Sequence, residues 1–294
     1  MVKMILGTVQ LGMPYGINNA VGQPNMREAM DILDYAYQNG VDTLDTASSY
    51  GDSEKVIGNY INQHNDKVFR VCTKLPVRME KMNITDCCEE SRQKLGVDKL
   101  YVYYLHRFEQ CKNDNVLRQL LRLKESGQIT NIGISIYQPD ELQYIIENLS
   151  DVIDVVQIPF NVMDNNRWTQ DELLGCANRK GIKLYARSIF LQGVILSNID
   201  SEICQKMEIT SQMTRLQDIS KSLKRSVAQL AIDYVSSIEE IERWLIGCET
   251  VEQIKENIGL CKNARRLESN MCEEIKQISQ SLSEKVIDPR KWKK

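Results

Sequence analysis

Four side chains in the first part of the chain have the types needed to protonate a carbonyl oxygen. Asp45 and Tyr50 share the segment Asp-Thr-Ala-Ser-Ser-Tyr, Lys74 follows Phe-Arg-Val-Cys-Thr, and His106 follows Tyr-Val-Tyr-Tyr-Leu. A phenol with an ordinary pKa of about 10 is a poor acid at neutral pH, and a neighbouring ammonium lowers that pKa. We therefore expect Lys74 to activate Tyr50, and Asp45 to keep Lys74 charged. A neutral imidazole at His106 would then hydrogen-bond the carbonyl oxygen of a substrate.

Polar residues end six successive apolar runs of the chain. After Asp45, Lys74 and His106 come Ser135, Gln157 and the pair Arg187 and Ser188. In a barrel of parallel strands, the C-terminal strand ends meet on one face, and active sites lie there. One such residue alone is best explained as a strand-end cap or turn residue. Polar residues at six successive strand ends instead predict a functional site at one rim.

Short apolar runs alternate with amphipathic stretches along the chain, which predicts repeated strand–helix units. The predicted strands are 5–8, 41–45, 69–74, 100–105, 129–134, 152–158, 182–186 and 242–247. The predicted helices are 25–39, 53–63, 84–95, 115–126, 139–149, 171–180, 212–223, 227–236, 251–260 and 263–281, while 189–211 lacks a clear period and is expected to be a long loop with some helix. Seven or eight such units favour an α/β fold, a single (β/α)8 TIM barrel with an extra C-terminal helix.

The ends of several predicted helices carry capping signals. Asn25 and Ser53 are of the residue types that cap a helix N-terminus, and Gly96 and Gly127 follow two of the predicted helices. A glycine just past a helix adopts the left-handed backbone that ends it. These residues therefore predict where four helix ends lie.

Length and composition limit the class of protein. The chain has 294 residues, 42% apolar and 26% charged, with no composition break or linker. We expect one globular domain over 1–294, with a C-terminal extension from about residue 261. That extension is expected to pack across the barrel exterior, and closure over the substrate is the alternative.

Charge and cysteine content exclude several partners. A net charge of −3 gives no field for nucleic acid, and no apolar run approaches the ~20 residues of a membrane span. The nine cysteines contain no C-x-x-C pair and only two histidines exist, so we expect no metal site. Free thiols and the lack of a signal peptide predict a cytoplasmic protein.

Taken together, the motifs resemble those of the aldo-keto reductases from Gly7 to about Asn257. They are Asp45-Thr-Ala-Ser-Ser-Tyr50-Gly51-x-x-Glu54-x-x-x-Gly58, Thr73-Lys74, Leu105-His106-Arg107, Gly127-x-Ile-x-x-Ile-Gly133-Ile-Ser135, Val156-Gln157-x-Pro159-Phe160-Asn161, Gly193 and Glu256-Asn257. The resemblance implies a (β/α)8 barrel that binds a nicotinamide dinucleotide without a Rossmann domain. The chain accordingly has no G-x-G-x-x-G motif.

The resemblance also implies a role for each matched position. Asp45, Tyr50, Lys74 and His106 match a catalytic tetrad in which Tyr50 is the general acid. The cofactor-binding positions are Ser135 and Gln157 for the carboxamide, Ser188, Leu191 and Gly193 for the pyrophosphate, and Gly247, Gln253 and Asn257 for the adenosine. Arg187 stands where many members stack an aromatic ring on the nicotinamide. Its guanidinium can stack as well, or it can contact a phosphate or an acidic substrate.

The implied cofactor is NADP(H), but the sequence leaves NAD(H) open. Positions that clamp the 2′-phosphate in several branches are Gly247, Cys248 and Gln253 here, and none is charged. Lys255 or Lys262 would have to supply the missing positive charge, whereas Glu249 and Glu252 would repel a phosphate if they point inward.

The resulting hypothesis is an NAD(P)H-dependent reductase that converts an aldehyde or ketone to an alcohol. A cofactor-binding regulatory or sensor subunit with little turnover is the alternative, and a Schiff-base aldolase or isomerase using Lys74 is a third. The polar loops 108–113, 163–169 and 189–211 indicate a small, sugar-like carbonyl substrate. The oligomeric state stays open.

Overall fold

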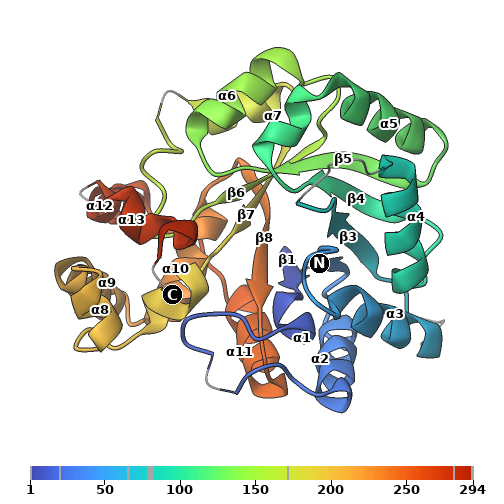
Figure 1. Ribbon diagram of the computed structural model, residues 1–294. Helices are drawn as coiled ribbons and strands as arrows, with labels where there is room; N and C mark the ends of the chain where they lie inside the picture. The colour runs from blue at the N-terminus through green and yellow to red at the C-terminus, as the bar shows by residue number, and fades with distance from the viewer. Residues whose placement is uncertain are drawn as a thin grey trace.

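Eight parallel strands close into a barrel in the computed structural model, which describes residues 2–19, 21–64, 67–77, 83–170, 172–280 and 282–292 (Figure 1). The strands are β1 (Met4–Gly7), β2 (Thr43–Asp45), β3 (Arg70–Lys74), β4 (Leu100–Leu105), β5 (Ile129–Ser135), β6 (Val155–Pro159), β7 (Lys183–Arg187) and β8 (Ile241–Gly247). The barrel is closed by β8 pairing with β1, with Gly247 opposite Gly7. The predicted (β/α)8 fold is confirmed, and the largest shift is at β6, which begins at Val155 rather than at 152.

Helices cover the outside of the barrel in the predicted order. They are α2 (Met26–Gln38), α3 (Ser53–Gln63), α4 (Ile84–Leu95), α5 (Asp114–Glu125), α6 (Pro139–Asn148), α7 (Leu173–Arg179), α9 (Thr210–Ser222), α10 (Val227–Ser237) and α11 (Val251–Lys262). Asn25 caps α2 through a reciprocal bond pair with Glu28. The predicted start of α7, at residue 171, lies outside the described residues.

The prediction that Ser53 caps a helix is wrong. Asp52 occupies the cap position of α3, and Ser53 is the first helical residue. The Ser53 hydroxyl donates to the Thr8 carbonyl at 2.8 Å and is buried. It therefore ties the loop that carries Tyr50 to the end of β1, a long-range contact that local capping patterns do not reveal.

Short helical turns lie in the loops, and two of them fall in 189–211, the segment expected to contain some helix. They are α1 (Val9–Gly12), η1 (Phe108–Lys112), η2 (Leu191–Leu196) and α8 (Glu202–Lys206). The C-terminal helix predicted over 263–281 begins later, as α12 (Ser269–Ser279), and α13 (Glu284–Ile287) and η3 (Pro289–Lys291) follow it. Residue 281, the predicted helix end, lies outside the described residues. Figure 1 shows α12 and α13 on the side of the barrel that carries α8, α9 and α10.

Two apolar layers hold the barrel together. The larger one lies between the strands and the surrounding helices. The smaller one fills the barrel interior with Ile5, Cys72, Val102, Tyr104, Val155 and Tyr185. Because side chains alternate along a strand, the residues two positions after Cys72, Val155 and Tyr185 also face inward. Those residues are Lys74, Gln157 and Arg187. The strands therefore place these polar side chains at the C-terminal mouth of the barrel, next to the interior apolar cluster.

All nine cysteines are free thiols in this arrangement. Among the described residues, no helix combines the length and the apolar character needed to cross a membrane.

The contact between α3 and α4 depends on a glycine. A Cβ placed on Gly58 would overlap the carbonyl oxygen of Lys94 in α4. Gly259 in α11 is also helical, but a Cβ there would meet nothing within 4 Å. The two glycines thus form a matched pair that differs only in the space around them.

Gly58→Ala is expected to lower the free energy of unfolding by about 1–3 kcal/mol, because the two helix backbones must separate to admit the methyl group. Gly259→Ala is expected to be neutral or to stabilise by up to about 1 kcal/mol, since alanine is the better helix former. Urea unfolding followed by circular dichroism measures both. Equal effects of the two substitutions would show that the helices do not pack this closely.

Candidate active site

A cavity of about 420 Å³ opens at the C-terminal ends of the strands. Twelve of the thirteen predicted site residues line it: Asp45, Tyr50, Lys74, His106, Ser135, Gln157, Arg187, Ser188, Gly193, Gly247, Gln253 and Asn257. The exception is Leu191, whose side chain is fully buried outside the lining residues. The barrel therefore gathers residues that are up to 212 positions apart, from Asp45 to Asn257, around one hollow.

A buried ion pair lines the cavity at the ends of β2 and β3. The Lys74 ammonium contacts the Asp45 carboxylate, and their side chains are 3% and 4% exposed. The ammonium also donates to the Thr46 carbonyl at 2.8 Å. Burial alone would lower the pKa of Lys74, but Asp45 and Tyr50 outweigh it, and the pKa of this ammonium lies above its ordinary value. Lys74 is therefore charged at neutral pH, as the sequence predicts.

Tyr50 lies beside this ion pair, with the Lys74 nitrogen 5.1 Å from the centroid of its ring. Its loop turns sharply after β2, and Gly51 takes a left-handed backbone with φ of +55°. Lys74 acts on the pKa of Tyr50 in the expected downward direction, but burial has the larger effect. Burial raises the pKa of the phenol more than the ammonium lowers it, so the net pKa of Tyr50 is above 10. Tyr50 is thus held in the protonated form that a proton donor needs.

His106 follows β4 and faces Tyr50 edge-on, with ring centroids 6.2 Å apart. Its backbone N–H donates to the Gln110 side chain at 2.7 Å, which holds the turn into η1. Burial, followed by the positive charge of Lys74, lowers the pKa of the imidazole to about 4. The ring is therefore neutral at physiological pH and, as predicted, can donate one N–H hydrogen bond.

Gln157 connects the ion pair to the wall of the cavity. Its Nε2 donates to the second carboxylate oxygen of Asp45, and it lies opposite Ser135 in the β5–β6 register. Its Oε1 is buried and has no hydrogen-bond partner among the described residues. A buried acceptor without a partner costs free energy, so this oxygen has an unused capacity to accept a hydrogen bond.

The loop after β7 is backbone-strained at the cavity wall. Ser188, Leu191 and Gln192 all adopt left-handed backbone angles, with φ of 61°, 48° and 54°. The Asn161 side chain donates to the Ser188 carbonyl at 3.0 Å and holds the first of these residues in place. Such conformations persist only where the surroundings enforce them, and they cluster at ligand clamps.

The end of the cavity beside β8 is acidic. Gln253 binds Glu249 twice, accepting from its backbone N–H at 2.7 Å and donating to its carboxylate at 2.9 Å. Glu249 and Glu256 both line this part of the cavity, whereas Glu252 does not. Lys255 instead stacks over Tyr35, and Lys262 donates to Asn39, so neither lysine contributes the positive charge that the sequence allowed.

The sequence matches the aldo/keto reductase family over residues 3–280. The chain belongs to the aldo/keto reductase family. This assignment makes it an NAD(P)-dependent oxidoreductase, as the motifs predict.

Relatives of this aldo/keto reductase match it over most of its length. An uncharacterized oxidoreductase of Bacillus subtilis, YqkF, is 24% identical over 276 residues, covering 85% of this chain and 86% of that protein. The L-glyceraldehyde 3-phosphate reductase of Escherichia coli O157:H7 is 22% identical over 311 residues, with 92% and 88% covered. The holo structure of the aldo-keto reductase AKR11C1 from Bacillus halodurans has the same fold, with a TM-score of 0.74 at 18% identity, covering 99% of this chain and 95% of that one.

Several cavity residues of this aldo/keto reductase were not predicted. Gln10, Tyr15, Asn18 and Asn19 come from the loop after β1, and Tyr137 follows β5. Asn18 donates to the Gly193 carbonyl at 2.8 Å, so the loop after β1 meets the loop after β7 across the mouth. The rule that polar residues at strand ends line the site would have found Gln10, had it been applied to the first strand as well.

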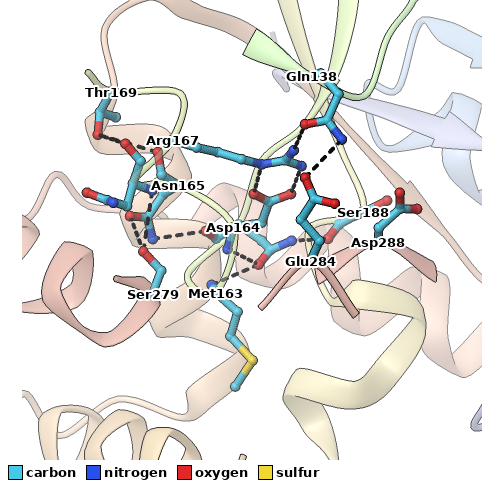
Figure 2. A network of polar contacts seen from close by, with 12 residues as sticks. Gln138, Met163, Asp164, Asn165, Arg167, Thr169, Ser188, Ser279, Glu284 and Asp288 are labelled. Atoms are coloured by element: carbon cyan, nitrogen blue, oxygen red, sulfur yellow. Dashed lines mark hydrogen bonds and ion pairs between the residues drawn. The ribbon is translucent and has the colours of Figure 1, made fainter. Parts of the chain in front are cut away.

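The loops expected to select the substrate contribute unequally. None of the residues in 108–113 or 163–169 lines the cavity, whereas Ile189, Phe190, Gln192, Gly193 and Leu196 do. The loop 163–169 instead contacts the C-terminal segment, as Figure 2 shows. Arg167 lies between Asp164 and Gln138, and Ser279 of α12 donates to Asn165 at 3.0 Å.

The C-terminal segment reaches farther than the exterior packing expected for it. α12 packs against α9 on the outside, as expected. Beyond it, the Arg290 guanidinium stacks 3.4 Å from the ring centroid of Tyr137, a cavity-lining residue. The segment after α12 thus packs against a residue that lines the cavity.

The imidazole of His106 is expected to titrate near pH 4 in the folded protein, well below its ordinary value of about 6.5. Because the folded pKa is the lower one, the stability contributed by His106 is present above pH 6.5 and is lost as pH falls toward 4. A ¹H–¹³C NMR titration of the two histidine rings measures this, and His106→Gln assigns the resonance by removing it. A midpoint near 6.5 would contradict the buried, electropositive environment.

Proposed function

We propose that this protein reduces the carbonyl group of a small aldehyde or ketone to an alcohol, with NADPH or NADH as the reductant. The observation that carries the proposal is the convergence of Tyr50, the Asp45–Lys74 ion pair and a neutral His106 at one end of a single cavity. These groups supply a proton, a charge that stabilises its departure, and a hydrogen bond to orient the acceptor.

Each residue has a distinct part in the proton transfer. The Tyr50 hydroxyl donates its proton to the carbonyl oxygen. As the phenolate forms, the nearby Lys74 ammonium stabilises its charge, which offsets the effect of burial on the phenol. Asp45 keeps the ammonium charged and in place, and His106 donates a hydrogen bond to the same carbonyl oxygen. A bound reduced nicotinamide supplies the hydride for the carbonyl carbon.

The cavity fits a nicotinamide dinucleotide. The unpartnered Oε1 of Gln157 would accept from the N–H of a carboxamide, with Ser135 beside it in register. Toward the other end, the strained loop from Ser188 to Gly193 would hold the pyrophosphate, and Gly247, Gln253 and Asn257 would line the adenosine site. Leu191 would act only through its backbone, since its side chain is buried.

Two other functions are less well supported. A sensor or regulatory subunit with little turnover needs the cofactor site but not a complete proton-donating group, and all four residues of that group are in place here. A Schiff-base enzyme needs a neutral lysine nucleophile. Lys74 has a raised pKa and is bound by Asp45 and Thr46, so it is held in the wrong form for that chemistry.

Tyr50→Phe is expected to lower kcat for carbonyl reduction by about 10²–10⁴ while leaving cofactor affinity nearly unchanged, because only the general acid is lost. Tyr144→Phe is the matched control, since it removes a phenol from the exposed surface of α6. Steady-state rates with a panel of aldehydes and cofactor titration by tryptophan fluorescence provide the measurements. Near wild-type kcat in the Tyr50 variant would assign the proton donor elsewhere.

We further propose that the preference between NADPH and NADH is weak. The family favours NADPH, but the described residues around the adenosine end offer no lysine or arginine, only Glu249 and Glu256. A 2′-phosphate would lie near these carboxylates without a cationic partner, whereas a 2′-hydroxyl can donate to one of them. The two carboxylates therefore weaken the preference for NADPH that is typical of the family.

Both cofactors are expected to support turnover, with kcat/KM values within roughly two decades, or under ~3 kcal/mol. Glu249→Gln should shift the ratio toward NADPH by about 3- to 10-fold, because it removes a repelling charge and keeps a hydrogen-bond acceptor. Glu252→Gln, three residues later in the first turn of α11 and outside the cavity, should leave the ratio unchanged. A wild-type NADPH preference beyond about three decades would reveal a phosphate clamp in another part of the chain.

A further inference from the structure

One charged side chain of the cavity, Arg187, has no ion-pair partner within 4 Å among the described residues, and Asp164, the buried carboxylate on which its charge acts, is paired with Arg167 instead. Asp45 and Lys74 neutralise each other, and His106 is uncharged at neutral pH. Glu249 and Glu256 lie at the adenosine end. The reacting end of the cavity therefore carries a net positive charge.

The guanidinium of Arg187 is held in a defined position. Its Nη2 donates to the Ile136 carbonyl at 3.0 Å, and the group stacks 4.1 Å from the ring centroid of Tyr137. Its Nε is buried and has no hydrogen-bond partner among the residues described. A fixed guanidinium with an unused N–H is suited to bind a planar carboxylate or a phosphate.

The neighbouring arginines do not share this property. Arg290, which also stacks on Tyr137, is paired with Asp288, with Nη2 and Oδ2 2.7 Å apart. Arg167 binds both oxygens of Asp164, at 2.6 and 2.8 Å. Arg187 is thus the one arginine lining the cavity in the described part of the chain, and it forms no ion pair of its own there.

Arg187 belongs to the reacting end rather than to a remote part of the wall. Arg187 lies two residues after Tyr185 on β7, so both side chains point into the barrel, where Tyr185 belongs to the interior apolar cluster. Burial is the largest influence on the pKa of both Tyr50 and His106, and Arg187 adds a smaller downward effect on each. Its charge is therefore felt by the two groups that would contact the carbonyl oxygen.

We propose that Arg187 binds an anionic group, a carboxylate or a phosphate, carried by the carbonyl substrate itself. This inference rests on the proposed carbonyl reduction and adds the class of substrate: aldehydes or ketones with an acid group a few bonds from the carbonyl. The diphosphate of a nicotinamide cofactor has the same chemistry, so the experiment must separate the two sources.

The test compares matched substrates and variants. Succinic semialdehyde is paired with butanal, and glyceraldehyde 3-phosphate with glyceraldehyde, so that each pair differs in the acid group. In the wild type, at least one acidic aldehyde should exceed its neutral partner in kcat/KM by about 10-fold or more. Arg187→Gln should lower the ratio of kcat/KM for that acidic aldehyde to kcat/KM for its neutral partner by roughly 10-fold or more, whatever it does to the rate common to both. Arg179→Gln, an exposed arginine on α7, is the control and should leave this ratio unchanged.

Two further measurements identify the source of the anion. The Kd values of NADPH and NADH, from tryptophan fluorescence, should change by less than about 3-fold in Arg187→Gln. Succinate, which cannot react, should bind the wild-type enzyme–cofactor complex and bind Arg187→Gln about 10-fold more weakly.

The outcomes are distinct. A 10-fold rise in cofactor Kd with no change in substrate preference would assign Arg187 to the cofactor and overturn the inference. The lack of any acidic preference in the wild type would also overturn it. If no aldehyde is turned over at all, the proposed reduction fails, and succinate binding alone then decides whether Arg187 is an anion site.

Discussion

The ion pair between Asp45 and Lys74 is the interaction on which the rest of the site depends. Two charges that are 3% and 4% exposed would be costly to bury separately, and each makes the burial of the other tolerable. The pair also depends on the barrel, because β2 and β3 must lie side by side to bring the two charges together. The Thr46 carbonyl then accepts a hydrogen bond from the ammonium, and the Gln157 amide donates one to the carboxylate. Tyr50 and His106 acquire their proposed roles from lying next to this charge.

Burial acts in opposite directions on the two groups beside that ion pair. It raises the pKa of Tyr50 and lowers the pKa of His106, and in both cases the uncharged form is the result. An uncharged phenol can give up a proton, and an uncharged imidazole can donate a hydrogen bond without adding charge to the cavity. Burial therefore holds both groups in the uncharged form that the proposed carbonyl reduction requires.

The two ends of the cavity differ in charge, and this difference organises the proposals made for it. The end beside Tyr50 and His106 holds Arg187 without a carboxylate partner, and the end proposed to hold the adenosine contains Glu249 and Glu256. An acidic substrate fits the first, and a cofactor with a free ribose hydroxyl fits the second. The C-terminal segment contributes by supporting Tyr137, on which Arg187 stacks.

The order of strands and helices and the barrel could be predicted from the sequence, because apolar periodicity is a local pattern. The family and twelve of the residues that line the cavity followed from residues at strand ends and from the motifs that carry the family resemblance. The role of Ser53, the cavity loop after β1 and the contact of Arg290 with Tyr137 could not be predicted, since each depends on segments distant in the chain. The direction of the pKa shift at Tyr50 belongs to the same group. A neighbouring lysine can be inferred from a motif, whereas the desolvation that outweighs it is a sum over every atom that surrounds the phenol, and only the tertiary structure determines that sum.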